Sequence, residues 1–159
     1  MMQVFLPDSE ATAHLGQALA VTRPRPAIVH LQGDLGAGKS TLARALLRAL
    51  GVEGPVRSPT YTLVERYPVE GGEAWHLDLY RIGDAGELDF LGLDGDEAVL
   101  WLVEWPERGR AALPPPDLTA WLQLEGEGRA LRLQAHGARG EAWLAALQAG
   151  GYLRGLSVI

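Results

Sequence analysis

The chain has 159 residues, a mass of 17.1 kDa, 47% hydrophobic residues and a formal net charge of −6 at pH 7. This length predicts a single domain over residues 1–159, with enough apolar residues for a hydrophobic core. The acidic balance argues against nucleic-acid binding by a broad basic face, because neutralising phosphates requires clustered Lys and Arg.

Two further absences narrow the class of protein. The chain has no cysteine, which excludes disulfides and thiolate metal sites. No apolar stretch reaches the roughly 18 residues of a membrane span, and no basic flank leads into an apolar signal region. We therefore expect a cytoplasmic protein that has no membrane partner.

The first predicted elements are a strand and a helix. Residues 3–6 are typical of an edge strand, and Asp8 or Ser9 is suited to cap a helix that packs to about Val21. The Arg-Pro-Arg-Pro run that follows is a stiff link into a short buried strand over residues 27–32.

A glycine-rich loop follows this strand and precedes a predicted helix over residues 41–50. It fits the pattern G-x-x-x-x-G-K-[ST] at every fixed position. A strand, a loop of this kind and a helix together form the context in which the pattern predicts phosphate binding. The loop and the residue after it are Gly33, Asp34, Leu35, Gly36, Ala37, Gly38, Lys39, Ser40 and Thr41.

Each fixed residue type of this loop has a physical reason. Glycines let successive backbone N–H groups converge on a phosphate, and the helix N-terminus adds partial positive charge. Lys39 can then reach the β- and γ-phosphate oxygens, and the Ser40 hydroxyl can bind Mg²⁺. Lys39 is the only lysine among fourteen Lys and Arg, which favours a site where the larger guanidinium does not fit.

The middle of the chain predicts a loop, a hairpin and a short helix. Residues 55–62 carry two prolines, which forbid a regular strand interior. Residues 63–67 and 74–80 are expected to pair around a turn at Gly71-Gly72. The segment 84–87 resembles a capping box that opens a short helix.

The second half continues the alternation of strands and helices. Residues 99–104 form a nearly continuous apolar run that ends in an acid, as a buried central strand does. Helical turns over 106–112, a hairpin of 118–125 with 130–135 and a helix over 141–148 should follow, and the apolar tail 150–159 either docks or stays flexible. This order predicts an α/β, P-loop NTPase-like three-layer fold with a mixed sheet and added antiparallel hairpins.

Two acids outside the loop are candidates for chemistry, because ligands in open α/β sheets bind beyond the carboxyl ends of the strands. Asp78 lies late in an apolar strand, and Glu104 ends the most hydrophobic strand. One could hold Mg²⁺ while the other polarises the attacking water. In the alternative interpretation Asp78 caps the backbone or pairs with Arg81, and Glu104 has a similar structural role.

Other polar and aromatic side chains have more than one interpretation. Ser58, Thr60 and Thr62 form either a loop that senses the γ-phosphate and its Mg²⁺ or a surface turn. Trp105 either walls the site, faces a partner or packs in the core. His76 is interpreted as a satisfied strand histidine rather than a catalytic one, and the four histidines form no zinc-type cluster.

Five blocks of the chain together resemble the TsaE (YjeE) family, the ATPase of bacterial tRNA threonylcarbamoyladenosine (t6A) biosynthesis. The resemblance covers about residues 3–135. The blocks are residues 33–41, 58–64, 76–81, 87–88 and 104–107.

The resemblance implies a Mg²⁺-dependent ATPase that uses ATP/ADP, and it assigns roles to residues of this chain. Lys39 would contact phosphates and Ser40 would bind Mg²⁺. Asp78 and Glu104 would be the magnesium-side and catalytic acids, with the division between them open. Thr60 would belong to a switch-like catalytic loop.

The resemblance also implies contacts around the nucleotide. Thr41 would lie beside it, Trp105 would be functionally sensitive, and Leu6 and Arg129 would lie on the nucleobase side. The acidic tail of some members has no clear counterpart after Leu147.

The partners implied by the resemblance are the TsaB and TsaD proteins. The chain would bind their heterodimer, reset it by ATP hydrolysis and meet tRNA only indirectly. A small-molecule P-loop kinase is the alternative, with Asp78 as base and Arg81, Arg108 and Arg110 over the phosphates. A nucleotide-dependent interaction module is the third possibility, and the oligomeric state stays open.

Overall fold

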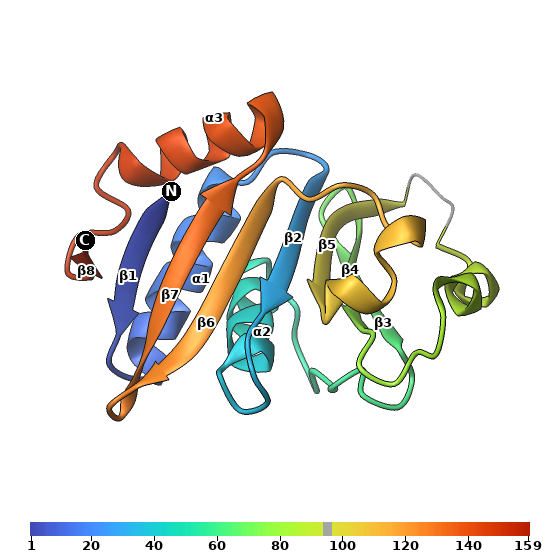
Figure 1. Ribbon diagram of the computed structural model, residues 1–159. Coiled ribbons are helices and arrows are strands. Elements are labelled where there is room, and N and C mark those ends of the chain that lie inside the picture. Colours follow the sequence, from blue (N-terminus) through green and yellow to red (C-terminus); the bar gives the residue numbers. More distant parts are fainter. Residues whose placement is uncertain (94–96) are drawn as a thin grey trace.

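The computed structural model describes residues 1–93 and 97–159, and in this part of the chain eight strands form one sheet (Figure 1). The strand order is β3-β4-β5-β2-β6-β7-β1-β8. The elements are β1 Met2–Leu6, α1 Ser9–Thr22, β2 Ala27–Gln32, α2 Lys39–Ala49, β3 Val64–Val69, β4 Gly72–Asp78, β5 Ala98–Glu104, β6 Leu118–Glu125, β7 Gly128–Ala135, α3 Gly137–Gln148 and β8 Ser157–Val158, with 3-10 helices η1 Ala85–Leu91, η2 Pro106–Arg108 and η3 Arg110–Ala112.

The sheet is parallel at its centre and antiparallel at its two sides. β4, β5, β2 and β6 run parallel, whereas β3 pairs antiparallel with β4, and β7, β1 and β8 extend the other side antiparallel. The central strands are nearly continuous apolar runs because both of their faces are buried. The predicted α/β class, the mixed sheet and the added hairpins are confirmed.

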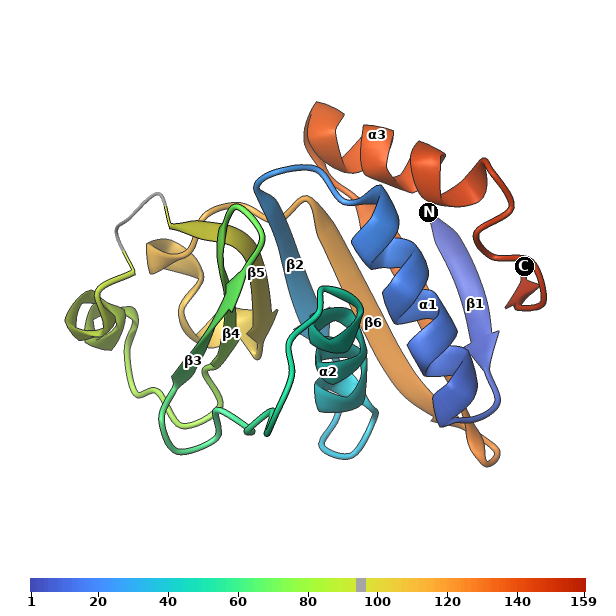
Figure 2. The same ribbon diagram turned by 180° about the vertical axis from the view of Figure 1, so that it is seen from behind.

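Helices α1 and α2 pack on one face of the sheet, and α3 packs against α1 and β7 (Figure 2). The main core lies between this face and the helices. A second core lies on the opposite face of β4 and β5, where η1 and the chain near η3 cover Trp75, Leu77 and Trp101. Among the described residues, no helix covers the same face of β6, β7 and β1 (Figure 1).

Local signals set several element boundaries. The Asp8 side chain accepts a hydrogen bond from the Ala11 N–H at 2.9 Å, so Asp8 is the N-cap of α1. Asp84 caps η1 through the Gly86 N–H, and Glu87 accepts from the Gly83 N–H. The expected short helix is therefore present, as a 3-10 helix.

Some boundaries differ from the expectations. The last helix begins at Gly137, four residues earlier than its apolar spacing indicates, and strand β4 ends at Asp78. The short strand β8 pairs with β1, so the tail docks and β1 is not the outermost strand. In the described residues no helix is long and apolar enough to cross a membrane.

Candidate functional site

The glycine-rich loop joins β2 to α2 at the carboxyl end of the central strand. Gly38 is the N-cap of α2 at φ 109°, and Gly33 has φ 147°. Few L residues adopt such φ values, and a Cβ on Gly33 would also clash with the carbonyl oxygen of Leu122 in β6. Glycine therefore shapes both ends of the loop, where another residue would strain the backbone.

Lys39 begins α2 and is almost fully buried, with 5% of its surface exposed. Its ammonium donates hydrogen bonds to the carbonyls of Gly33 and Asp34 and lies 4.3 Å from the centroid of the Trp105 ring. These contacts hold a positive charge at the mouth of the loop, where phosphate oxygens would need it.

The charge of Lys39 is balanced by nearby acids. Burial lowers the pKa of Lys39 from its ordinary value, and the carboxylates of Glu104, Asp78, Asp34 and Glu107 oppose that shift. The arrangement is therefore a buried cation with carboxylates around it, and ionisable groups perturbed in this way cluster at functional sites.

Glu104 ends β5 and is 3% exposed. Its two carboxylate oxygens lie 3.2 and 3.0 Å from Ser40 Oγ, which donates to them. Its Oε2 also lies 2.6 Å from Nε2 of His76, in the neighbouring strand β4. The hydroxyl at the end of the loop and the acid at the end of the central strand are thus in direct contact.

Asp78 ends β4 directly opposite Glu104 in the parallel register and is 7% exposed. Its Oδ1 accepts a hydrogen bond from the Tyr80 N–H at 3.0 Å, so the proposed backbone cap exists. Arg81 instead lies over the Tyr61 ring, with 4.4 Å from its Cζ to the ring centroid.

The protonation of Asp78 is shifted by its surroundings. Burial raises the pKa of Asp78 above its ordinary value, and the negative charge of Glu104 adds to the shift. The Tyr80 N–H, His76 and Lys39 oppose it. A carboxylate held this way binds protons more readily than one in water.

Trp105 follows Glu104 and adopts a left-handed backbone conformation at φ 55°. Such a conformation costs about 1–3 kcal/mol in a residue other than glycine and persists only where the surroundings enforce it. The ring is held between Lys39 and Tyr80, whose ring centroid is 4.9 Å away. Trp105 lines the cavity beside the loop and also packs against the second core.

The hydroxyl-rich segment between α2 and β3 contains no helix or strand. Ser58 and Thr60 share a hydrogen bond of 2.7 Å between their hydroxyls, and Thr62 donates to Glu65. Thr60 is the member of this group that faces the loop.

One cavity of about 250 Å³, called here the phosphate-loop cavity, collects most of the residues predicted from the sequence. It lies where β4, β5 and the glycine-rich loop meet. Its lining residues are Leu35, Gly36, Gly38, Lys39, Ser40, Thr41, Thr60, Asp78, Glu104, Trp105 and Arg129.

The remaining predicted residues lie around this cavity rather than in it. Leu6 lines a neighbouring hollow of about 200 Å³, which Thr41 and Arg129 share. Ala37 is buried beneath the loop. Gly33 and Asp34 face a larger groove on the other side of the loop.

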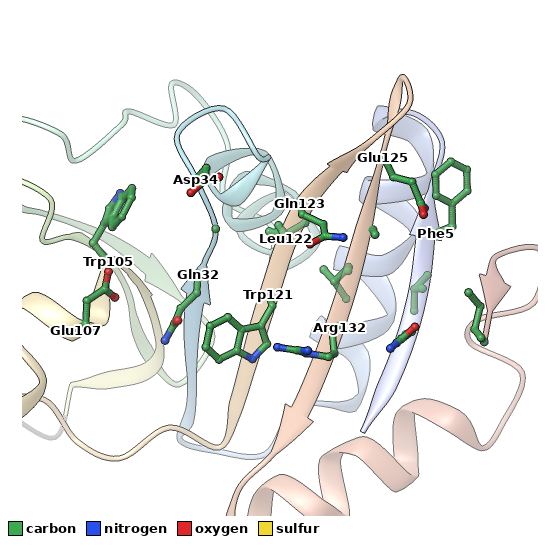
Figure 3. Close-up of a pocket in the computed structure, with 16 residues that line it drawn as sticks. Phe5, Gln32, Asp34, Trp105, Glu107, Trp121, Leu122, Gln123, Glu125 and Arg132 are labelled. Carbon is green, nitrogen blue, oxygen red and sulfur yellow. The ribbon is translucent and has the colours of Figure 1, made fainter.

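That larger hollow, called here the open-face groove, measures about 560 Å³ and lies on the uncovered face of β6, β7 and β1 (Figure 3). At its centre Arg132 lies over the Trp121 ring, 5.2 Å from Cζ to centroid. Gln32 and Gln123 point into the same space. Its charged side chains are exposed.

The residues of the phosphate-loop cavity fit a magnesium ion and a nucleotide. The donors are a hydroxyl and two carboxylates, which are the hard oxygen ligands that Mg²⁺ takes. In the described residues no three His, Cys, Asp or Glu side chains form a metal cluster.

Sequence reasoning missed two contacts of this site. His76 is satisfied, as expected, but its partner is Glu104. The signal was available: His76 precedes Asp78 by two residues, and such residues share one face of a strand. Arg129 donates to the carbonyl of Gly36 at 3.4 Å, a contact between distant segments that no local pattern predicts.

The central parallel strand, the glycine-rich loop and the helix after it define a P-loop NTPase-like α/β protein. A family model described as "Threonylcarbamoyl adenosine biosynthesis protein TsaE" matches residues 6–132. The chain therefore belongs to the TsaE family, and its role lies in the biosynthesis of threonylcarbamoyladenosine in tRNA.

Individual proteins agree with this assignment. The tRNA threonylcarbamoyladenosine biosynthesis protein TsaE of Haemophilus influenzae is 37% identical over 138 residues, 82% of this chain and 87% of that protein. The TsaE protein of a Synechocystis strain is 44% identical over 113 residues, 67% of this chain and 71% of that protein. The crystal structure of YdiB from Bacillus subtilis has a TM-score of 0.75 at 26% identity, covering 92% of this chain and 95% of that one.

Proposed function

We propose that this chain is a Mg²⁺-dependent ATPase that binds the TsaB–TsaD heterodimer and supports t6A formation through ATP hydrolysis. The observation that carries the proposal is the contact between Ser40 and Glu104 beside the buried ammonium of Lys39. A purely structural loop gains nothing from burying the charged groups of Lys39 and Glu104, because desolvating charge is costly.

The contacts favour one division of roles between the two acids. Ser40 donates to Glu104, so these two residues would hold Mg²⁺ together, directly or through water. Magnesium, when bound, would neutralise charge that develops on the phosphate oxygens. Asp78 would then orient the attacking water and accept its proton, which its raised pKa favours.

The remaining residues would position the nucleotide. The loop N–H groups and Lys39 would bind the β- and γ-phosphates, as this loop type does. Trp105 would cover the ammonium and keep water from it. Leu6 and Arg129, in the adjoining hollow, would lie on the nucleobase side.

The proposed partner relation rests on family membership. The TsaE family serves a tRNA modification, yet this chain carries a net charge of −6. An acidic chain makes a poor direct tRNA ligand. We infer that TsaB and TsaD hold the RNA and that this chain cycles nucleotide for them.

Steady-state ATP hydrolysis tests the proposal, measured with and without the TsaB–TsaD heterodimer. We expect slow turnover alone, a large change with the heterodimer, and loss of turnover in Glu104→Ala and Asp78→Ala. Removal of Mg²⁺ with EDTA should abolish it too. Normal hydrolysis by both variants in both conditions would refute the assignment of the acids.

The same ATP turnover assay also tests the alternative that the protein is a small-molecule kinase. A kinase needs arginines over the phosphates, but Arg81 and Arg108 rest on the rings of Tyr61 and Tyr80. A metabolite that accepts the γ-phosphate much faster than water does would establish the kinase function instead.

A further inference from the structure

The shortest hydrogen-bond contact of the buried acids joins two neighbouring parallel strands. Nε2 of His76 lies 2.6 Å from Oε2 of Glu104, and the two residues are 2% and 3% exposed. In the register of β4 and β5, His76 stands opposite Leu102 and Asp78 opposite Glu104. The imidazole therefore reaches forward along the sheet to the carboxylate.

The hydrogen-bond pattern indicates which nitrogen of His76 carries the proton. In the described part of the chain, its Nδ1 is buried and has no hydrogen-bond partner. A buried N–H without a partner costs more than an unshared lone pair on nitrogen. The neutral ring with its proton on Nε2 thus fits, and His76 donates to Glu104.

His30 is a second buried strand histidine, and it makes no such hydrogen bond in the described residues. It lies in β2, is also 2% exposed, and neither of its ring nitrogens has a partner in the described residues. It lies on the face opposite His76, next to Ile28 of the second core in the strand alternation. The two histidines therefore match in burial and differ in contact with Glu104.

We propose that His76 is the positioning residue of the site: it fixes one oxygen of Glu104, so that the carboxylate meets the Ser40 hydroxyl and Mg²⁺ in a single orientation. A glutamate carboxylate rotates freely about its last bond, a broad two-fold torsion. A donor on one oxygen removes that freedom before nucleotide arrives. This inference rests on the proposed Mg²⁺-nucleotide function of the same site.

The role proposed for His76 is that of a residue that hydrogen-bonds to a metal ligand without binding the metal itself. Loss of such residues lowers metal affinity or activity by about 10–100-fold, although they never touch the metal. His76 touches neither phosphate nor metal in this scheme, so its effect should appear in magnesium dependence and not in nucleotide affinity alone.

Two substitutions separate the hydrogen bond from the packing. His76→Phe keeps a ring and removes the donor, whereas His76→Gln keeps a neutral N–H at about the same reach. His30→Phe and His30→Gln are the matched controls. Thermal unfolding first checks that each variant is folded at the temperature of the assays. Each variant is then compared with the wild type.

The first readout is calorimetric and needs no turnover. A non-hydrolysable ATP analogue is titrated at a series of Mg²⁺ concentrations and in EDTA. We expect His76→Phe to need about 10–100-fold more Mg²⁺ to reach half of the Mg²⁺-dependent gain in affinity for the analogue. The affinity for the analogue in EDTA should be unchanged. His76→Gln and both His30 variants should behave as the wild type does.

The second readout is ATP hydrolysis, where kcat should fall in His76→Phe and recover in His76→Gln while KM for ATP changes little. Equal effects of His76→Phe and His30→Phe, or no rescue by Gln, would overturn the inference. So would an unchanged magnesium dependence. If the wild type does not hydrolyse ATP, the proposed function falls, while the calorimetric comparison still decides the role of His76.

Discussion

The phosphate-loop cavity and the open-face groove lie on opposite sides of the same glycine-rich loop, and they differ in size, charge and burial. The groove is larger, about 560 against about 250 Å³. Its charged groups, such as Arg132 and Glu107, are exposed, whereas Lys39, Asp78 and Glu104 in the smaller cavity are buried.

In this molecule the volume of a cavity is therefore a weaker guide to function than the burial of its charged side chains. Exposed charges cost little, so their presence in a groove demands no explanation. Burying a lysine and two acids is costly unless each is paired. The smaller cavity retains them, and the contacts that pair them are the contacts a phosphate and a magnesium ion would use.

Lys39→Ala should have the largest effect on nucleotide affinity. A hydrogen bond to a charged group contributes about 1.5–3 kcal/mol, so we expect ATP affinity to fall roughly 10- to 100-fold. Calorimetric titration measures this, and circular dichroism checks that the fold is intact. Unchanged ATP affinity in a folded Lys39→Ala variant would show that the phosphate-loop cavity does not bind the nucleotide.

Trp105→Ala should have the next largest effect. A cation–π contact contributes about 0.5–2 kcal/mol, so loss of the ring over Lys39 should lower turnover about 2- to 30-fold. Trp105→Phe, which keeps an aromatic face, is the control and should retain more activity. A variant that is less stable but turns over normally per folded molecule would show that Trp105 serves only the core.

Much of the fold and of the candidate site can be predicted from the sequence because both depend on local signals. Glycines, prolines and apolar runs are short-range patterns, so the loop, the hairpins and the central strand were found with their boundaries nearly right. Asp78 and Glu104 are candidates from the sequence because a polar residue at the end of an apolar strand is conspicuous, and both do end their strands.

The contacts of the site that the sequence does not predict depend on which distant segments meet in space. His76 and Glu104 are 28 residues apart, and only the parallel register of β4 and β5 brings them together. The same holds for Arg129, which reaches Gly36 across 93 residues. The left-handed Trp105 also had no sequence signal, since tryptophan carries no preference for that conformation.

Asp78→Asn should raise stability in the absence of nucleotide and metal. The pKa of Asp78 is raised in the folded state, so its stabilising contribution is present at acid pH and is lost as the pH rises through the folded-state value. At pH 7 the ionised form therefore costs stability, and the amide removes that cost.

Thermal unfolding in EDTA between pH 4 and 8 measures this difference. We expect the Tm of Asp78→Asn to exceed that of the wild type by a margin that grows with pH. For a chain of this size, about 1 kcal/mol corresponds to about 2–4 °C. A margin that shrinks towards neutral pH would show that the Asp78 carboxylate stabilises the fold.

Arg132→Ala should have the smallest effect. Arg132 is exposed in the open-face groove, and surface substitutions usually change free energies by less than about 0.5 kcal/mol. ATP affinity should therefore stay within about a factor of two of the wild type. A loss as large as that of Lys39→Ala would move the nucleotide site to the groove.

A crystal structure with ADP and Mg²⁺ would show directly where the nucleotide binds. We predict the phosphates against the backbone of residues 33–40, with the Lys39 ammonium turned from the carbonyls of Gly33 and Asp34 towards them. We also predict Ser40 and Glu104 at the metal. ADP bound in the open-face groove, with the loop and Lys39 unchanged, would contradict this prediction.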